Sequence, residues 1–397
     1  MPTHCPPGLE TRWDSTRYAP SVAKQGVSNE AGQPNQPIAS AVTRLNAIGP
    51  YYTMFPLEFP LDALANAGPD TWVLDPFCGR GTTLFAARLR GVPSVGIDVS
   101  PVAAALAAAK LASANADDVV AYVAALLSDA AGVDLPSGEF WDLAFHRTTL
   151  RQLVAVRNAL LGAKHKLSVM TRALLLGILH GPINKGLPSY LSNQMPRTYA
   201  TKPASAVRYW RTRGLHPPAV DLLDVVRRRA DWVLDTLPPE SRGLVVNGDC
   251  RHALPDIRTR FSWVVTSPPY LGMRTYVPDQ WLRSWFLGGP PDVDYTSEGQ
   301  IGRWAIARFV RELAACWRSV AKSCVDGAVL IVRFGALPSL QVDPSEVLTD
   351  SLHDSGMPWR VLGSAPAGVP PRRARQATQF TSAGSVVEEV DLIARLG

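Results

Sequence analysis

Residues 266–270 read Thr-Ser-Pro-Pro-Tyr and follow a short apolar stretch, residues 262–265, that is typical of a buried strand. Consecutive prolines hold φ near about −65° and donate no backbone N–H, so the carbonyls around Ser267 and Pro268 are left as acceptors beyond the strand end. Tyr270 adds a flat apolar face with a polar tip, which suits stacking on a planar ring. The pentapeptide alone therefore indicates either a loop that binds a planar amine or an ordinary Pro-Pro turn.

A second motif lies far upstream, at residues 71–83, which read Thr-Trp-Val-Leu-Asp-Pro-Phe-Cys-Gly-Arg-Gly-Thr-Thr. A strand pattern here runs into a glycine turn and then a helical pattern. Gly79 and Gly81 let the backbone lie against a ligand, but the third glycine of the dinucleotide fingerprint is missing, which disfavours NAD. A second strand pattern ends in Asp98, about 20 residues further on, where a carboxylate can accept hydrogen bonds from both ribose hydroxyls. The pattern favours an unphosphorylated nucleoside.

Together the two motifs resemble the S-adenosylmethionine-dependent DNA amino-methyltransferases. The cofactor loop of that family looks like Asp-Pro-Phe-Cys-Gly-x-Gly-Thr-Thr, and its catalytic loop looks like Ser/Asn/Asp-Pro-Pro-Tyr/Phe. The resemblance covers residues 75–83 and 267–270, both at expected strand ends. It implies a Rossmann-like class I methyltransferase fold, S-adenosyl-L-methionine as cofactor and no metal. The catalytic residues that it implies are Ser267, Pro268, Pro269 and Tyr270.

The resemblance extends less strongly to two other places. Asp249 follows an apolar run and looks like the third strand-end acid, on the adenine side of the cofactor, although a turn or helix-cap role is a comparable alternative. Residues 51–56 look like the segment that closes over the methionine end. The cofactor-binding residues implied are Tyr52, Phe55, Asp75, Pro76, Phe77, Cys78, Gly79, Gly81, Thr82, Thr83, Asp98, Asp249 and Thr266.

Serine at position 267 bears on the substrate. Within the resembled family, Ser-Pro-Pro-Tyr is associated mainly with cytosine-N4 methylation, and Asp-Pro-Pro-Tyr with adenine-N6 or, in related enzymes, guanine-N2 of RNA. A hydroxyl and a carboxylate can both accept from an amine, so the preference for cytosine is an association within the family. Cys78 is not in a Pro-Cys setting, which disfavours a cytosine-C5 mechanism. We therefore expect direct methyl transfer to the exocyclic nitrogen of a flipped base.

Adenine-N6 methylation in DNA stays the nearest alternative. An RNA base N-methyltransferase would share both loops, and a non-catalytic DNA-binding protein could have kept the fold. Binding to duplex DNA against structured RNA would separate the RNA enzyme from the others.

Charge is unevenly distributed along the chain. The net charge is +6, yet residues 147–229 hold fifteen Lys and Arg against two acids, a local +13, which leaves −7 elsewhere. Such segregation is expected where a polyanion binds. In residues 183–218, basic and aromatic residues are interspersed with prolines. The helical patterns on either side indicate a helical insertion that carries a basic loop. A structural helical subdomain is the alternative. The DNA-binding residues expected are Lys185, Asn193, Gln194, Arg197, Lys202, Arg208, Tyr209, Arg211 and Arg213.

Four regions follow from these patterns: a polar arm (1–45), a first methyltransferase part with the cofactor loop (46–135), the basic insertion (140–238) and a second part with the catalytic loop (243–397). Alternating strands and helices predict an α/β fold with a mostly parallel sheet. Strands are expected at 72–75, 93–97, 244–247, 262–266 and 328–333, with a closing antiparallel hairpin at 360–362 and 386–394. Helices are expected at 62–67, 84–89, 101–128, 149–161, 167–180, 219–237 and 304–322.

Five cysteines without a CxxC pair support neither a disulfide framework nor a zinc ribbon. No signal peptide is expected at the first residues, and the longest apolar stretch is too short to span a bilayer. We therefore expect a cytoplasmic enzyme that acts on double-stranded DNA without a membrane partner, with a cognate restriction nuclease as a possible partner. The sequence leaves the oligomeric state open.

Overall fold

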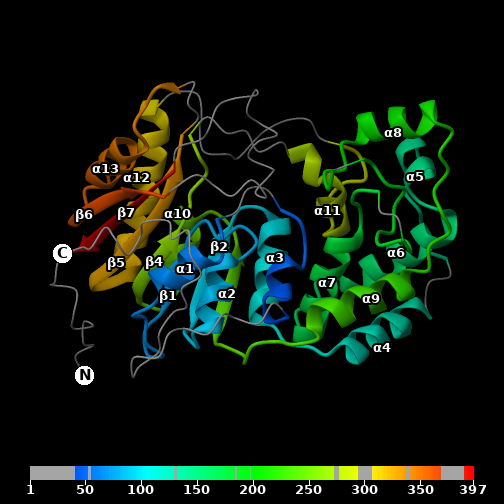
Figure 1. Ribbon diagram of the computed structural model, residues 1–397, viewed down its shortest axis with the longest axis horizontal. Helices are drawn as coiled ribbons and strands as arrows, with labels where there is room; N and C mark the ends of the chain where they lie inside the picture. Colours follow the sequence, from blue (N-terminus) through cyan, green and yellow to red (C-terminus); the bar gives the residue numbers. More distant parts are fainter. Residues whose placement is uncertain are drawn as a thin grey trace.

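The computed structural model describes residues 41–51, 55–128, 132–183, 186–196, 198–271, 277–293, 306–336, 340–367 and 389–397. Within them, one seven-stranded sheet has the order β3-β2-β1-β4-β5-β7-β6 (Figure 1). The first five strands run parallel, and β7 lies antiparallel between β5 and β6. This is the Rossmann-like class I methyltransferase arrangement, so the expected fold and its C-terminal antiparallel hairpin are confirmed. The strands are β1 (Val73–Asp75), β2 (Ser94–Asp98), β3 (Gly243–Asn247), β4 (Phe261–Thr266), β5 (Cys324–Gly335), β6 (Trp359–Pro366) and β7 (Glu389–Leu396).

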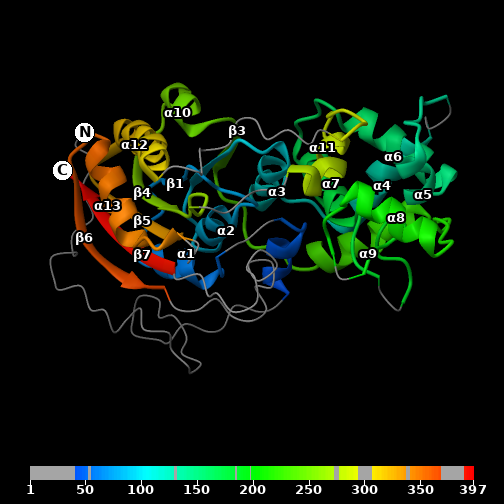
Figure 2. The same cartoon turned by 90° about the horizontal axis from the view of Figure 1, so that it is seen from above.

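Helices cover both faces of the sheet, so its central strands are buried on both sides (Figure 2). Successive residues of β1 face opposite layers: Val73 packs with Phe59 and Ala86, while Leu74 packs with Phe309 and other residues of the opposite layer. One layer holds α1 (Glu58–Ala63), α2 (Thr82–Leu89) and α3 (Pro101–Leu111), and the other holds α10 (Cys250–Ala253), α12 (Ile306–Ser323) and α13 (Pro344–Asp354).

A second group of helices lies beside the β3 end of the sheet and packs against α3 (Figure 2). A single apolar cluster joins α3 to this group, and it includes Trp281 and Phe286, which come after the catalytic loop in the chain. The group comprises α4 (Ala116–Leu127), α5 (Glu139–Ala144), α6 (Arg147–Leu160), α7 (Lys166–Ile178), α8 (Pro203–Thr212), α9 (Leu222–Leu234) and α11 (Trp281–Phe286).

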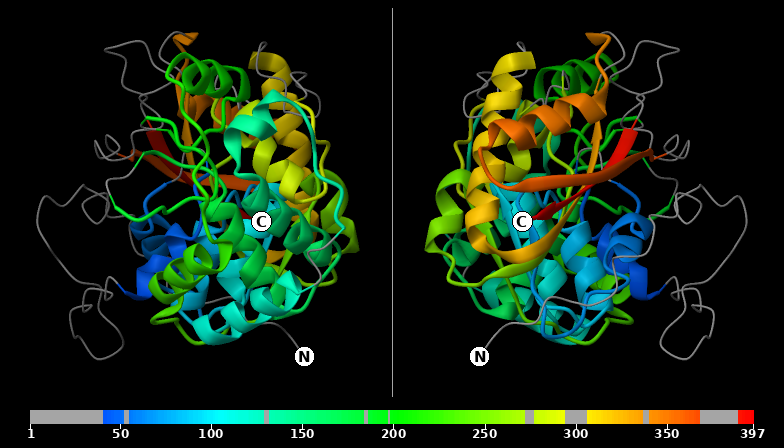
Figure 3. Two further views of the ribbon diagram at one scale, coloured as in Figure 1. Left: turned by 90° about the vertical axis from the view of Figure 1, so that its right-hand side faces the viewer. Right: turned by 90° about the vertical axis from the view of Figure 1, so that its left-hand side faces the viewer.

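The single helix expected over residues 101–128 is wrong. Ala112 is extended, and the Asn115 side chain accepts from the Asp118 N–H to begin a new helix. Consequently α3 stays on the sheet while α4 packs against α6, α7 and α9. The view along the molecule from its helical end shows α4 to α9 gathered in front of the sheet (Figure 3).

Several smaller elements differ from the sequence expectations. The basic loop contains α8, and α13 is a helix that the patterns did not predict. Of the polar arm, residues 42–45 belong to the 3-10 helix η2 (Val42–Ala47), where Leu45 is fully buried. Two further 3-10 turns are η3 (Leu254–Asp256) and η4 (Val277–Gln280). Across the described ranges, every helix is too short or too polar to cross a membrane.

Candidate active site

The two sequence motifs meet at the carboxyl edge of the sheet. Strands β1 and β4 are parallel neighbours, so the loops that follow them lie side by side. The buried hydroxyl of Thr266 donates to Asp75 Oδ1 at 2.6 Å, and the Thr83 hydroxyl donates to the Val265 carbonyl at 3.3 Å. The first residue of the catalytic loop is therefore hydrogen-bonded to the first residue of the cofactor loop, across 191 positions of sequence.

Asp75 is fully buried at this junction. Its Oδ1 also accepts the Phe77 N–H at 3.2 Å, whereas Oδ2 has no hydrogen-bond partner among the described residues. Burial raises the pKa of Asp75 to about 6, against the lowering effect of its hydrogen bonds, the one from Thr266 first. A buried carboxylate oxygen of this kind suits a cationic group of a ligand, such as an ammonium.

The glycine loop has the backbone geometry that close approach to a ligand requires. Gly79 and Gly81 have φ of 50° and 85°, in the region that favours glycine. The Gly79 N–H and the Ser100 N–H each donate at 2.9 Å to a different oxygen of Asp98. Burial raises the pKa of Asp98 to about 6. Because each carboxylate oxygen has a second acceptor position, Asp98 fits a ribose diol as well as the loop backbone.

The other cofactor-loop side chains are packed into the protein. Pro76, Cys78 and Thr82 are buried, and the Phe77 ring meets Trp317 edge-on with centroids 6.2 Å apart. Burial raises the pKa of the Cys78 thiol well above its ordinary value, so this cysteine is a poor nucleophile.

The segment before β1 lies partly against this loop. The Tyr51 ring, at the start of the segment that the resemblance placed over the cofactor, comes within 3.9 Å of the position that a Cβ on Gly79 would occupy. Phe55 packs edge-on against Phe59, with centroids 5.2 Å apart. Tyr52 lies outside the described residues.

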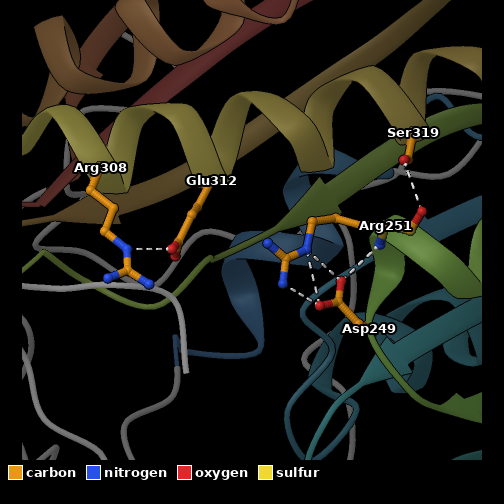
Figure 4. A network of polar contacts seen from close by, with 5 residues as sticks. All are labelled: Asp249, Arg251, Arg308, Glu312 and Ser319. Atoms are coloured by element: carbon orange, nitrogen blue, oxygen red, sulfur yellow. Dashed lines mark hydrogen bonds and ion pairs between the residues drawn. The ribbon is translucent and has the colours of Figure 1, made fainter. Parts of the chain in front are cut away.

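Asp249 caps α10, which is the alternative that the sequence left open. Its Oδ1 accepts the Arg251 N–H at 2.9 Å, and the Arg251 guanidinium binds both carboxylate oxygens (Figure 4). This pairing lowers the pKa of Asp249. Ser319 of α12 donates to the Arg251 carbonyl, and Arg308 pairs with Glu312 further along the same helix (Figure 4). The Asp249 carboxylate thus faces its own helix, and its cofactor role stays a prediction.

In the catalytic loop, Ser267 is partly buried, Pro268 is buried and Pro269 is exposed. The Tyr270 hydroxyl donates to Glu389 Oε1 at 2.9 Å, and the Ser267 side chain lies beside it. Its ring meets Phe334 of β5 edge-on, with centroids 5.9 Å apart. Burial, with the nearby Glu389 carboxylate, raises the pKa of Tyr270 well above its ordinary value. The contacts with Glu389 and Phe334 therefore fix both the hydroxyl group and the ring of Tyr270.

The ends of β5 and β7 complete this edge. Arg333 forms a two-pronged bond to Asp391, with both N–O distances 2.7 Å, and its guanidinium lies 4.1 Å from the centre of the Phe59 ring. The Leu271 N–H donates to the Gly335 carbonyl at 3.3 Å, which fastens the loop exit to β5. Sequence reasoning missed Glu389, Arg333 and Asp391, because no local pattern marks them.

Two of the expected DNA-binding residues serve internal contacts. Asn193 is buried, its amide donates to the Leu143 carbonyl at 3.2 Å, and its Oδ1 accepts the Gln194 N–H. The Gln194 carbonyl accepts the indole N–H of fully buried Trp210. The side-chain polar groups of Asn193 are thus engaged within the protein.

The remaining basic residues divide into internal and exposed ones. Arg172 donates to two carbonyls at the end of α6, and Arg229 donates to the carbonyls of Ala47 and Ile48. Three others form ion pairs with acids: Lys166 with Glu240, Arg211 with Glu139, and Arg227 with Asp117. Much of the local +13 therefore serves the helical group itself.

An exposed basic face is left on and beside α8. Lys202 and Arg208 are exposed, and Arg213 lies 4.2 Å from the centre of the Tyr209 ring. Arg211 is 63% exposed despite its pairing with Glu139. Lys185 and Arg197 lie outside the described residues.

No family model matches the chain, and no curated protein matches it in sequence. Among solved structures, it is similar to rRNA methyltransferase aviRa from Streptomyces viridochromogenes, with 16% identity, a TM-score of 0.33 and coverage of 91% of this chain and 94% of that one. It is also similar to TrmN from Thermus thermophilus, with 10% identity, a TM-score of 0.33 and coverage of 90% and 53%. It is similar as well to geranyl diphosphate C-methyltransferase from Streptomyces coelicolor A3(2), with 10% identity, a TM-score of 0.32 and coverage of 86% of this chain and 75% of that one. The fold assignment rests on the strand order of the sheet.

Proposed function

We propose that the protein transfers a methyl group from S-adenosyl-L-methionine to the exocyclic N4 amine of a flipped cytosine in DNA. The observation that carries this proposal is the contact between the two motif loops, through the Thr266 bond to Asp75 and the Thr83 bond to Val265. A loop suited to a nucleoside cofactor and a loop suited to an amine thereby share one edge of a class I methyltransferase sheet.

The residues present fit the cofactor. When bound, S-adenosylmethionine supplies an electrophilic methyl group on a sulfonium. Asp75 Oδ2 would accept the ammonium of the methionine end, because this buried oxygen has no partner among the described residues. Asp98 would accept the ribose hydroxyls, while Gly79 and Gly81 keep the loop backbone open to the nucleoside.

The target amine would be held by the catalytic loop. In cytosine the amine lone pair is conjugated with the ring, which makes it a poor nucleophile. Acceptance of its two hydrogens by the Ser267 hydroxyl and the Pro268 carbonyl would orient the nitrogen and free its lone pair. Tyr270 would support the ring, and its contacts with Glu389 and Phe334 mean that it is already fixed before substrate arrives. The rate gain would come mainly from positioning, with no covalent enzyme intermediate.

DNA would be bound through the exposed basic face of α8, with Lys202, Arg208 and Arg213 as phosphate contacts and Tyr209 beside them. Phosphate contacts of this kind fix orientation on the duplex without reading sequence. Flipping the base costs a few kcal/mol, which such contacts and stacking would offset. A cytoplasmic restriction-modification setting is consistent with this activity and is part of the proposal.

The test is to incubate purified protein with isotope-labelled S-adenosylmethionine and plasmid DNA, and then to digest the DNA to nucleosides for mass spectrometry. We expect the label in N4-methylcytosine. Label in N6-methyladenine would overturn the inference from Ser267 and leave the rest standing. Label found only in parallel reactions with ribosomal or transfer RNA would replace DNA by RNA as the substrate.

A matched pair of variants makes the assay specific to the proposed site. Ser267→Ala should lower the rate at least about 100-fold, because the amine loses an acceptor in the transition state. Ser284→Ala, in the short helix α11, should leave the rate unchanged. Equal rates for both variants and the unmodified protein would place the chemistry elsewhere.

A further inference from the structure

A row of polar side chains leads away from the proposed amine-binding loop. The Ser267 side chain lies beside the Tyr270 hydroxyl, which donates to Glu389 Oε1 at 2.9 Å. Glu389 is the first residue of β7 and pairs in register with Gly335 at the end of β5. A carboxylate from the far end of the chain thus terminates a path of hydroxyl groups that begins at the residue proposed to touch the substrate.

Methylation of an exocyclic amine requires a proton acceptor. When the nitrogen forms its bond to the methyl carbon, the electron pair of the sulfur–methyl bond moves to sulfur, and the nitrogen becomes positively charged. One N–H bond must then break, with its electron pair returning to nitrogen and its proton passing to a base. A serine hydroxyl is too weak a base to keep that proton, although it can pass it on.

We propose that Glu389 is the proton acceptor of the reaction, reached through the hydroxyls of Ser267 and Tyr270. Ser267 takes the proton from the amine as it gives its own to Tyr270, and Tyr270 gives its own to the Glu389 carboxylate. Each hydroxyl ends with one proton, as it began, and Glu389 ends protonated until it releases the proton to water. This inference rests on the proposed function and adds a residue that no sequence motif contains.

The surroundings of Glu389 suit this role. Arg333 on β5 and Asp391 on β7 lie near it, but they are bound to each other by two hydrogen bonds of 2.7 Å, so Arg333 already has a full counter-ion. Burial raises the pKa of Glu389 above its ordinary value, while the Tyr270 bond and Arg333 act in the opposite direction. A carboxylate with a raised pKa holds a proton better near neutral pH.

The first test compares Glu389→Gln and Tyr270→Phe with the unmodified protein in single-turnover methyl transfer across the pH range. The new glutamine amide would still accept from Tyr270, and the new phenylalanine would keep the aromatic ring, so both changes remove the proton path with little change in shape. We expect both variants to be slower by about 100-fold at neutral pH. The unmodified protein should gain rate as pH rises through the Glu389 pKa, and the Glu389→Gln variant should lack that rise. Glu346→Gln, exposed on α13, is the matched control and should behave as the unmodified protein.

Two further measurements separate a proton path from a structural role. Formate added to Glu389→Ala should restore rate, because a small carboxylate can occupy the space left by the side chain. In the protein without cofactor, the infrared carboxyl band that disappears in Glu389→Gln should titrate above the ordinary glutamate range. Unchanged binding of S-adenosylhomocysteine and DNA by both variants should accompany the loss of rate.

The outcomes distinguish the two proposals. Methyl transfer by the unmodified protein, with equal rates and pH profiles for Glu389→Gln, overturns the proton path and leaves the proposed function in place. Loss of cofactor binding in both variants, without formate rescue, also overturns it, since Glu389 would then be structural. Absence of methyl transfer to any nucleic acid by the unmodified protein overturns both proposals.

Discussion

Replacement of Asp75 by asparagine should make the protein more stable and at the same time poorer at binding its cofactor. The Asp75 pKa rises from 3.8 to about 6 because the carboxyl is fully buried. At 1.36 kcal/mol for each pH unit, this rise corresponds to about 3 kcal/mol by which the ionised carboxylate disfavours the native state. The asparagine side chain would carry no charge, and its amide oxygen can still accept the hydrogen bond from the Thr266 hydroxyl. Allowing for imperfect hydrogen bonds to the asparagine, we expect its free energy of unfolding to exceed that of the unmodified protein by about 1–3 kcal/mol at pH 8.

The sign of the pH dependence makes this prediction specific. A carboxyl whose pKa is raised on folding holds its proton in the native state after the unfolded chain has released it. The contribution of Asp75 therefore destabilises the native protein increasingly as pH rises from 3.8 to about 6, and is constant above that. The advantage of Asp75→Asn should be roughly half as large at pH 5 as at pH 8.

Urea unfolding of both proteins at the two pH values measures this difference directly. S-adenosylhomocysteine should stabilise the unmodified protein more than the variant, because its ammonium group would meet a carboxylate in one and an amide in the other. An advantage of equal size at both pH values, or a variant less stable at pH 8, would refute the reasoning, since the native site would then compensate the charge of Asp75 fully.

Three other changes probe the glycine loop, the junction of the helical group with the sheet, and the basic face. Gly81→Ala should destabilise the protein by at least about 1 kcal/mol and abolish cofactor binding. The reason is that φ at this position is 85° and the new Cβ would lie 2.8 Å from a backbone carbon of α3. Thermal unfolding would detect the loss of stability, and calorimetric titration would detect the loss of binding. Arg88→Met should lower the free energy of unfolding by on the order of 3 kcal/mol, because Arg88 is 1% exposed and makes hydrogen bonds to the C-terminal end of α3 and to the chain entering β3. An unchanged midpoint in urea would contradict this. Joint replacement of Arg208 and Arg213 by glutamine should weaken DNA binding and reduce the slope of log affinity against log salt concentration by about 2. Cofactor affinity should be unchanged, and Lys322→Gln is the control. A slope equal to that of the unmodified protein would mean that DNA binds elsewhere.

The sheet could be predicted from the sequence because its signals are local. Each strand is a short apolar run, and the glycines, prolines or acids that follow mark where it ends. The break between α3 and α4 was missed, since the residues from 101 to 128 are rich in alanine and the one cue is Asn115 at the start of the second helix. Helix α8 was missed because its prolines and charges looked like a loop, although Pro203 at the first turn is a common way for a helix to begin.

The site could be predicted in part, and the division has a physical reason. Asp75, Asp98 and the Pro-Pro loop were identified because a strand end followed by a distinctive peptide is visible in sequence. The bond between Tyr270 and Glu389 spans 119 positions and depends on the register of β7, which no local pattern encodes. The basic block could not be divided from the sequence, because charge alone does not distinguish an exposed basic residue from one, such as Arg229, that donates to carbonyls of its own chain.

The apolar cluster that unites the helical group with α3 has a consequence for how the protein is made. Its members Trp281, Leu282, Trp285 and Phe286 belong to α11, so they leave the ribosome after every other helix of the group and after the catalytic loop itself. Arg283 of the same helix donates to the carbonyls of Leu176 and His180 at the end of α7. The helical group therefore lacks part of its core until the chain has been synthesised past residue 286. During synthesis, the basic face should therefore form only after its own residues have long been made. It should form at about the stage when the catalytic loop, which it is proposed to serve, has also been synthesised.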